Sequence, residues 1–478
     1  MFETYRSAIG RRALLVGGAS LAVAAALSRT ACGAPAPAKE FKLVAAPTRL
    51  PIVGAPYPDT DVWAFGYSVP GPEIRVRQGE LVRIVVDNRL PEETAIHWHG
   101  VRVPNAMDGV AHLTQRPIAP GESFVYEFAC PDAGTFWYHP HQNSSVQVGR
   151  GLYGPLIVEE AEPITVDRDI AWMLDDWRLL DDASINPDFD NMMDVSHAGR
   201  VGNTVTVNGR MLDTFEVRAG ERIRLRLINA ANARIFGLKF QDHNPQIVAI
   251  DGQPVAPHAP AEGRVVLGPA MRIDLVLDMS GRPGRRFRVT DTFYRNREYR
   301  LLDLAYSEEI PLRETPAANP IRLPKNPLPE PDLQTAQRHQ VTLGGGMMGG
   351  MRSAIMDGKP ADIRTLMHNG LAWAINGVAA KGHGHDPLLT LQRDRSYVLE
   401  LINDTAWHHP MHLHGHTFRV ISRDGEPTRH REWQDTVLLD PRERAEVAFV
   451  ADNLGDWMFH CHILEHQAGG MMGVIRVA

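Results

Sequence analysis

The stretch VPGPEIRVRQGELVRIVVDN, residues 69–88, contains a β pattern that occurs twice more in the chain. The related stretches are VNGRMLDTFEVRAGERIRLRLINA (207–230) and INGVAAKGHGHDPLLTLQRDRSYVLELIND (375–404). In each, a glycine turn leads to a short apolar strand, a polar turn and an alternating strand that ends in asparagine. The asparagine lies nine residues after a turn residue every time: Gly79 to Asn88, Gly220 to Asn229 and Asp394 to Asn403. Such a regular spacing indicates a repeated domain.

The repeat predicts an all-β fold, because short alternating strands are separated throughout by glycine, proline and asparagine turns. A chain of 478 residues is long enough for three domains of ordinary size. We therefore predict three consecutive Greek-key β-sandwich or barrel domains over residues 45–160, 161–310 and 335–478. The proline-rich residues 311–334 are expected to form an extended linker.

Composition limits the partners of the chain. Hydrophobic residues make up 44 % and charged residues 22 %, as in soluble globular proteins, and the formal net charge is −7 without a polybasic run. This balance excludes nucleic acid as an expected partner. No stable membrane span is expected in the body of the chain.

The N-terminus reads as an export signal. Arg11 and Arg12 directly precede the weakly apolar run ALLVGGASLAVAAAL (13–27), which is too short to span a bilayer. We predict a twin-arginine-type signal over residues 1–38 and a periplasmic mature protein; an ordinary secretory signal or a simple anchor is the alternative. Removal of the signal would take Cys32 with it, so Cys130 and Cys461 remain and a disulfide framework is not expected. Cys130 ends an alternating strand pattern and is expected to be a buried core thiol.

A second repeat locates the metal chemistry. ESFVYEFACPDAGTFWYHPH (122–141) parallels ERAEVAFVADNLGDWMFHCH (443–462), and both end in a histidine pair. The counterpart in the second domain, MRIDLVLDMSGRPGRRFRVT (271–290), has no histidine. A metal centre is therefore expected at the contact of the first and third domains, with the second as a spacer or a support.

Histidines gather in four windows: HWH (97–99), HPH (139–141), HPMHLH (409–414) and HCHILEH (460–466). These 19 residues hold ten of the 21 histidines. Alternate side chains of a strand point to opposite faces, so His460 and His462 would face one way and Cys461 the other. The Cys461 thiolate, the His466 imidazole and the Met471 thioether match a blue-copper ligand set that lacks one histidine. Zinc is the rival metal, but its usual carboxylate ligands are absent from the windows. For His-Cys-His alone, a disulfide cysteine or an inert core thiol beside surface histidines would remain an alternative.

With these four motifs in this order, the chain resembles the multicopper oxidases, which include bacterial laccases and periplasmic cuprous oxidases. The resemblance implies cupredoxin-like domains and four copper ions: one type 1, one type 2 and a type 3 pair. It implies His409, Cys461, His466 and axial Met471 as type 1 ligands, and His97 and His412 as type 2 ligands. The type 3 ligands would be His99, His139, His141, His414, His460 and His462. Electrons taken up at Cys461 would pass through its backbone to His460 and His462, where dioxygen is reduced to water.

The residues that the family places around its copper ions are matched in part by this chain. Asp108 corresponds to the acid that the family places beside the type 2 copper, and we expect it to relay protons; an Asp-Gly turn is the alternative. Many bacterial members have a second acid at the position of Gln467, and Glu465 is expected to point elsewhere. Asp435 resembles a motif that packs near the type 1 site, or it is a buried structural residue. The methionine-rich residues 344–356, together with Met367, suit Cu(I) or form a flexible loop.

The sequence thus predicts an oxidase that couples one-electron oxidation of phenols, aromatic amines or Cu(I) to four-electron reduction of dioxygen, with a role in copper tolerance. A copper nitrite reductase is disfavoured because it has two domains. A non-enzymatic copper-binding protein, or a cell-division protein of cupredoxin-like fold, is the alternative from another class.

Overall fold

The computed structural model describes residues 37–315, 317–382 and 386–478. Residues 1–36, which make up nearly all of the predicted export signal, lie outside this set. From Lys39 to Ala478 the chain forms one compact unit. Among the described residues, none of the helices has the length and apolar character needed to cross a bilayer.

The first domain consists of two four-stranded sheets, ordered β2-β1-β4-β6 and β3-β8-β7-β5. Its strands are β1 (Lys39–Leu50), β2 (Thr60–Phe65), β3 (Ile74–Arg77), β4 (Leu81–Asn88), β5 (Ile96–His99), β6 (Ser123–Ala129), β7 (Gly134–Pro140) and β8 (Gly154–Glu159). The short helices η1 (Asn105–Met107) and α2 (Ser144–Gly149) lie in its connections.

The second domain has sheets ordered β10-β9-β12-β17-β14-β15 and β11-β19-β18-β13-β16. Its strands are β9 (Arg168–Trp177), β10 (Thr204–Val207), β11 (Thr214–Val217), β12 (Arg222–Asn229), β13 (Phe236–Phe240), β14 (Gln246–Ile250), β15 (Gln253–His258), β16 (Val265–Leu267), β17 (Arg272–Asp278), β18 (Arg286–Asp291) and β19 (Tyr299–Tyr306). It includes α3 (Met192–Ser196) and η2 (Ala261–Gly263).

The third domain has sheets ordered β23-β20-β25-β31-β27-β28 and β24-β33-β32-β26-β30, and β21 and β22 form a separate hairpin. The first of these sheets and the hairpin contain β20 (Gln337–Gly345), β21 (Ser353–Met356), β22 (Lys359–Asp362), β23 (Trp373–Ile375), β25 (Ser396–Asn403), β27 (Phe418–Arg423), β28 (Glu426–Pro427), β29 (Trp433–Gln434) and β31 (Arg444–Val450). The second sheet contains β24 (Leu389–Leu391), β26 (His409–Leu413), β30 (Thr436–Leu439), β32 (Gly455–Cys461) and β33 (Met472–Val477), and the helices are α4 (Ile363–His368) and α5 (Leu464–Ala468).

The three domains share one connectivity, which confirms the prediction of an all-β chain of three repeated domains. In each, the strand that ends in the repeated asparagine (β4, β12 or β25) pairs parallel with the domain's first long strand and antiparallel with β6, β17 or β31. Each second sheet pairs a short early strand parallel with the domain's last strand. The duplicated sequence patterns thus encode equivalent strands.

The repeated asparagine fixes the end of its strand to the following loop in each domain. Asn88 Nδ2 donates to the carbonyls of Glu92 and Ile118, and its Oδ1 accepts from the Leu90 amide. Asn229 and Asn403 make the equivalent bonds. In each, Oδ1 accepts from the amide two residues ahead, and Nδ2 donates to one carbonyl four or five residues ahead and to another more than thirty residues ahead. A buried amide side chain that satisfies three backbone groups holds the strand end in place.

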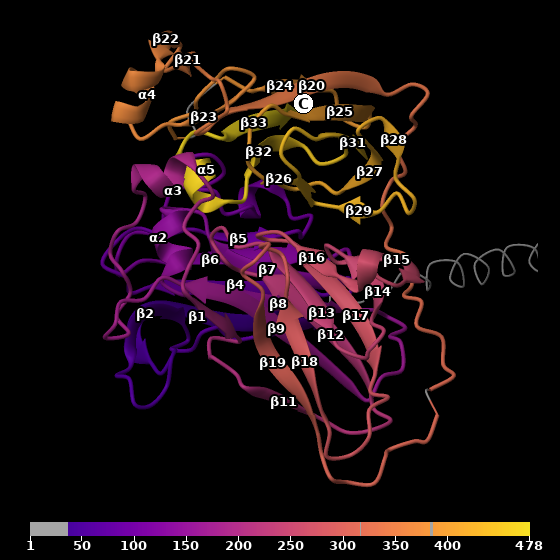
Figure 1. The fold of residues 1–478 in the computed structure, drawn as a ribbon. Helices are drawn as coiled ribbons and strands as arrows, with labels where there is room; N and C mark the ends of the chain where they lie inside the picture. The colour runs from indigo at the N-terminus through magenta and orange to yellow at the C-terminus, as the bar shows by residue number, and fades with distance from the viewer. Residues whose placement is uncertain (1–36, 316, 383–385) are drawn as a thin grey trace, which may run out of the picture. The chain divides into compact units, whose positions relative to one another are not determined.

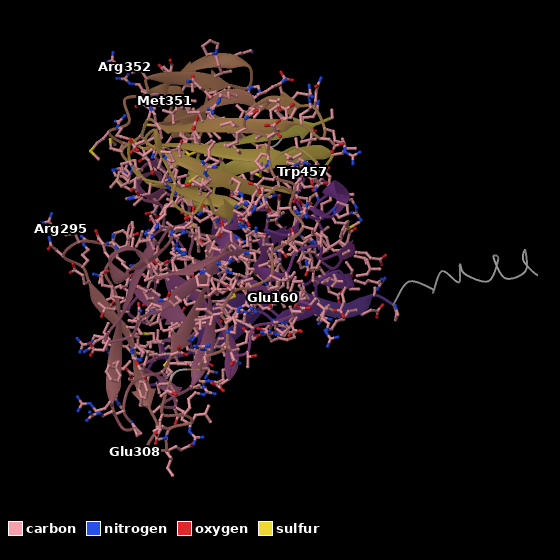
Figure 2. The ribbon with its side chains drawn as sticks, turned by 90° about the vertical axis from the view of Figure 1, so that its right-hand side faces the viewer. Glu160, Arg295, Glu308, Met351, Arg352 and Trp457 are labelled. Carbon is pink, nitrogen blue, oxygen red and sulfur yellow. The ribbon has the colours of Figure 1, made fainter. Side chains whose placement is uncertain are left out.

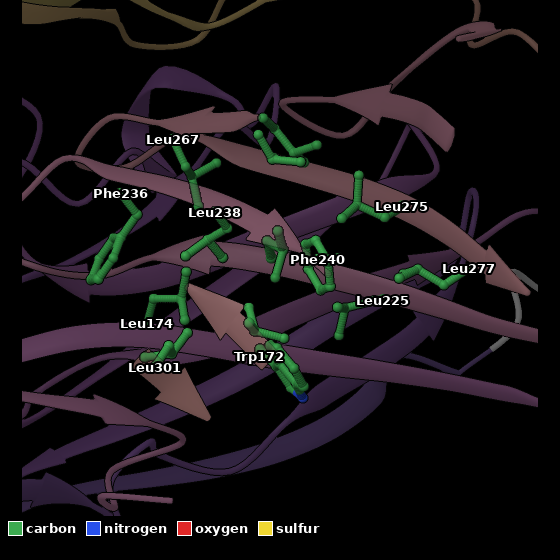
Figure 3. Packing of buried hydrophobic residues seen from close by; sticks show 14 of the residues in the cluster. Trp172, Leu174, Leu225, Phe236, Leu238, Phe240, Leu267, Leu275, Leu277 and Leu301 are labelled. Atoms are coloured by element: carbon green, nitrogen blue, oxygen red, sulfur yellow. The ribbon is translucent and has the colours of Figure 1, made fainter. Parts of the chain in front are cut away.

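Both faces of strand β12 are buried, and each packs against a different partner. Ile223, Leu225 and Leu227 join the apolar core of the second domain, which also contains Trp172 and Phe240 (Figure 3). Burying each such side chain is worth about 1.5–3 kcal/mol. On the opposite face, the buried arginines Arg224 and Arg226 bond Glu160 and Thr135 of the first domain. Glu160 lies in the interior of the molecule in Figure 2.

The contact between the first and third domains is built from histidine-bearing strands. Strands β26 and β32 of the third domain approach β5 of the first, as the labels in Figure 1 show, and the imidazole of His412 contacts that of His97, as that of His462 contacts that of His139. The predicted location of a metal centre is therefore where buried histidines of both domains meet.

Candidate metal centre

Strand pairing brings the four histidine windows together. β5 and β7 pair with His97 opposite His139, and β26 and β32 pair with His412 opposite His460. Cys461 and its partner Met411 face the apolar core of the third domain. The expected alternation along β32 is thus present, with the cysteine on one side and His460 and His462 on the other.

The cysteine side of β32 forms a compact set of three donors. His409 Nδ1 lies 3.4 Å from Cys461 Sγ, His466 Nδ1 lies 3.7 Å from the sulfur, and the two nitrogens are 3.2 Å apart. All three side chains are buried. Met471, also buried, joins them through backbone hydrogen bonds: its carbonyl accepts from the Cys461 amide, and its amide donates to the His466 carbonyl.

The far nitrogens of both imidazoles are already engaged as donors. Thr405 Oγ1 gives its proton to Asn403 and therefore accepts from His409 Nε2 at 2.8 Å. His466 Nε2 donates to the His197 carbonyl at 2.7 Å. The Nδ1 atoms of His409 and His466 therefore carry lone pairs, and both lie beside the sulfur.

Six histidines on the other side meet in three nitrogen pairs, two of them across the domain contact and the third within the third domain. The Nε2 atoms are 3.4 Å apart in His97 and His412, 3.1 Å in His414 and His460, and 3.3 Å in His139 and His462. The opposite nitrogen of five of them donates to an oxygen at 2.9–3.0 Å: His97 and His414 to Asp108, His412 to Asp435, His139 to Pro140 and His460 to Cys461. Their Nε2 atoms therefore carry bare lone pairs.

His99 and His141 complete this group, which we call the histidine cage (His97, His99, His139, His141, His412, His414, His460 and His462). His99 is reversed: its Nε2 bonds Asp435 Oδ1 and Thr436 Oγ1, both at 3.1 Å, and its buried Nδ1 has no hydrogen-bond partner among the described residues. The His141 ring centroid lies 4.9 Å from that of His414. All eight side chains are buried.

These donors fit metal ions. Two unprotonated nitrogens held about 3 Å apart repel each other unless a cation lies between them, and this arrangement is found in His97 with His412 and in His414 with His460. Burial lowers the pKa of His409 and His414 well below the usual value, so the imidazoles stay neutral and available as ligands. Sets of three donors within mutual reach are His97 with His99 and His139, His97 with His412 and His414, His141 with His414 and His460, and His409 with Cys461 and His466. Imidazoles with one thiol favour copper.

Asp108 lies directly against the cage. Its side chain is fully buried; Oδ2 accepts from His414 Nδ1 at 2.9 Å, and Oδ1 lies 3.3 Å from His97 Nδ1. Asp108 follows η1, and its backbone amide donates to the Asn105 carbonyl. One carboxylate thus contacts histidines of two domains.

The Glu465 side chain, next to His466, points away from the cage. Glu465 accepts from the Arg200 amide at 3.0 Å and from Asn232 Nδ2 at 2.9 Å, both in the second domain. Burial raises the pKa of Glu465 to about 7. Gln467 is buried, and its Oε1 has no hydrogen-bond partner among the described residues.

Asp435 is buried, as one of the two interpretations of its motif expected. Its side chain lies against His99 and His412 of the cage. Its fully buried partner Arg272 comes from the second domain. Burial alone would raise the pKa of Asp435, but the charge and hydrogen bonds of Arg272 outweigh it and hold this pKa well below its usual range.

The methionine-rich stretch divides into two parts. The Met347 amide donates to the Ser196 carbonyl and its carbonyl accepts from Trp407 Nε1, both at 2.8 Å, so Met347 lies near the ring of His197 that Trp407 contacts. Met347 and Met348 are exposed. Met351 and Met356 instead pack against a small apolar cluster around Leu366, at the tip of the third domain where Figure 2 labels Met351.

A cleft of about 1240 Å³ opens on the same side. Its lining includes His197, whose carbonyl accepts from His466, together with Trp407 and Tyr294. No pattern in the sequence marked His197, because its contribution is a backbone carbonyl. Through His197, the cleft adjoins the Cys461 group.

Comparison with known proteins agrees with this geometry. Multicopper oxidase family models match residues 51–163, 168–301 and 357–478. A multi-copper oxidase structure from Pseudomonas thermotolerans is 35 % identical with a TM-score of 0.80, covering 93 % of this chain and 100 % of its own. One from Pseudomonas parafulva is 37 % identical with a TM-score of 0.78, covering 92 % and 100 %. The multicopper oxidase MmcO of Mycobacterium tuberculosis is 29 % identical over 89 % of this chain and 84 % of its own. Because three repeated domains, the histidine cage and the Cys461 group all coincide with these matches, the chain belongs to the multicopper oxidase family.

Proposed function

We propose that the chain holds four copper ions at the two groups described above. The type 1 ligands are His409, Cys461, His466 and Met471; the type 2 ligands are His97 and His412; the type 3 ligands are His99, His139, His141, His414, His460 and His462. This proposal is carried by the nitrogen pairs that face each other between the first and third domains, His97 with His412 and His139 with His462, together with the pair of His414 and His460. Bound copper would supply one-electron acceptance beside Cys461 and reduction of dioxygen to water within the cage.

Cys461 connects the two groups through its own backbone. Its side chain lies with His409 and His466, and its neighbours His460 and His462 belong to the cage. In addition, His460 Nδ1 donates to the Cys461 carbonyl at 2.9 Å. An electron accepted at the sulfur thus has a covalent route and a hydrogen-bonded route to the cage.

Oxygen uptake tests the activity. The copper-loaded protein is expected to consume dioxygen with Cu(I) or with a dimethoxyphenol as reductant. Absence of uptake with both would favour a non-enzymatic copper-binding protein.

Reductants reach the type 1 group from the cleft at His197 and Trp407. Phenols and aromatic amines suit its aromatic lining. Cu(I) suits three exposed methionines: Met193, which lines the cleft, Met347, whose carbonyl accepts from Trp407, and Met348, which follows it. A curated relative, the copper resistance protein A homolog of Pseudomonas syringae, is 25 % identical over 92 % of this chain. That likeness supports a role of this chain in copper tolerance.

Replacing Met347 and Met348 together by leucine is expected to lower kcat/KM for Cu(I) about tenfold, which is ~1.4 kcal/mol, because soft ligands are lost while apolar volume is kept. Oxidation of dimethoxyphenol should stay unchanged. The matched control replaces Met351 and Met356, which pack against the Leu366 cluster, by leucine. Equal effects of the two double variants on Cu(I) oxidation would argue against a methionine site.

Replacing Asp108 by asparagine is expected to lower kcat by a factor on the order of 100 or more, because dioxygen reduction consumes protons and the amide cannot relay them. Reduction of the type 1 copper under anaerobic conditions should stay fast. The control is Asp132→Asn, another buried carboxylate of the first domain, which pairs with Arg102 away from the cage. Stopped-flow absorbance separates the two steps, and slow type 1 reduction in Asp108→Asn would count against a proton role.

We further propose export to the periplasm by the twin-arginine route with loss of residues 1–38, on the strength of Arg11 and Arg12 before an apolar run. The proposed domain bounds are 45–160, 161–310 and 335–478. Among the described residues, no helix or strand lies between Tyr306 and Gln337, which supports 311–334 as a linker.

A further inference from the structure

The second domain contains no histidine of the cage, yet one of its side chains reaches the cage wall. Arg272, the first residue of β17, is fully buried. Its Nη1 and Nη2 donate to the two carboxylate oxygens of Asp435, at 2.8 and 2.5 Å, and its Nε donates to the Thr135 carbonyl at 3.1 Å. This two-pronged contact fixes the plane of the carboxylate as well as its position.

Asp435 bonds two cage histidines, His99 through its carboxylate and His412 through its backbone carbonyl. Asp435 Oδ1 accepts from His99 Nε2 at 3.1 Å and from Thr436 Oγ1 at 2.8 Å. The Asp435 carbonyl accepts from His412 Nδ1 at 2.9 Å. These bonds leave His99 Nδ1 and His412 Nε2 as the nitrogens that face the cage.

A second residue of the same domain holds the backbone at this point. Asp251 Oδ2 accepts from the amides of Asp435 and Thr436 at 3.2 and 3.0 Å, and Asp251 Oδ1 accepts from the Arg272 amide at 3.0 Å. The second domain therefore forms hydrogen bonds with the Asp435 side chain and with the backbone amides of Asp435 and Thr436.

Gly100 leaves the space that the Arg272–Asp435 ion pair occupies. It has a φ of +85°, and a Cβ atom there would collide with Arg272 Nη2 and lie 2.6 Å from Asp435 Oδ2. The residue after the HWH window is thus fitted to the arginine of another domain as well as to its own turn.

We propose that Arg272, supported by Asp251, is a positioning residue that sets the orientation of His99 and His412 through Asp435, so that the second domain controls copper affinity at the cage. The inference rests on the proposed function, because it takes the cage as the copper site. A carboxylate that accepts from a ligand imidazole fixes the tautomer and increases the basicity of the ligand nitrogen. Arg272 keeps that carboxylate charged and correctly turned.

The test compares Arg272→Met with Arg224→Met. Both arginines are buried, belong to the second domain and pair with carboxylates; Arg224 bonds Glu160 and Asp274, and neither of these touches the cage. Each copper-loaded protein is dialysed against a graded chelator, and retained copper is followed by metal analysis, the type 2 electron paramagnetic resonance signal and the blue type 1 absorption.

Arg272→Met is expected to bind cage copper about 10–100-fold more weakly and to show an altered type 2 signal, with the blue absorption preserved. Arg224→Met should lower the melting temperature and leave both signals unchanged. Should Arg272→Met fail to fold, Arg272→Lys is tested instead, because lysine keeps the charge but cannot make the bidentate contact with the carboxylate. This variant is expected to bind cage copper about tenfold more weakly.

A double variant separates positioning from loss of stability. Arg272→Met with Asp435→Asn removes the unpaired buried charge, so it should regain melting temperature while cage copper stays weakly bound. Wild-type cage affinity and an unchanged type 2 signal in the Arg272 variants would overturn the inference. A wild-type protein that shows the blue absorption but no cage copper would overturn the proposed function, and this inference with it.

Discussion

Serine in place of Cys461 is expected to abolish the blue absorption and to reduce oxygen uptake to background with every reductant. The hydroxyl cannot replace a thiolate as a soft ligand, and the electron route from the type 1 group to the cage begins at this sulfur. His409 and His466 meet the sulfur at 3.4 and 3.7 Å, so the substitution removes the thiol that both imidazoles contact. Absorption spectroscopy and an oxygen electrode measure the two losses.

The other free cysteine supplies the control. Cys130 is also buried, and it lies in the apolar core of the first domain. Cys130→Ser should keep the blue absorption, the copper content and the oxygen uptake. In addition, Cys461→Ser should retain the type 2 signal, because its cage histidines are unchanged. A blue Cys461→Ser protein, or a colourless Cys130→Ser protein, would contradict the assignment.

Removal of copper is expected to lower the free energy of unfolding by about 4 kcal/mol at free copper near a thousand times the dissociation constant, because only the folded chain presents the cage. The effect should be large since the ligands join two domains: His97 belongs to the first and His412 to the third. Thermal unfolding with and without copper measures it.

Histidine variants identify the source of this stabilisation. His412→Gln should reduce the copper-dependent increase in melting temperature. His416→Gln changes a buried histidine of the third domain that lies outside the cage, next to Asp452, and should leave the increase intact. If both variants lost the increase to the same extent, cross-linking at the cage would not be its cause.

The sequence predicted the repeated fold because its signals are local. Strand alternation and the asparagine spacing depend on neighbouring residues, and Asn88, Asn229 and Asn403 do bond equivalent carbonyls in the three domains. Likewise, His460, Cys461 and His462 could be assigned to opposite faces because strand geometry alone fixes that alternation.

Contacts between domains could not be read in the same way. Arg272 and Asp435 lie 163 positions apart, and nothing near either residue indicates the other. The motif of Asp435 therefore could not show that its side chain reaches His99 and His412. His197 and Asn232 were missed for the same reason, since one contributes a carbonyl and the other an amide to residues of another domain. Such partners become visible only when three domains are packed together.

The most direct test of the account is copper analysis of the reconstituted protein combined with electron paramagnetic resonance. The proposed ligand sets predict four copper ions per chain, of which the type 1 and type 2 ions give signals and the coupled type 3 pair gives none. A single bound copper, or four ions that all give independent signals, would contradict the assignment of the histidine cage as a three-copper site.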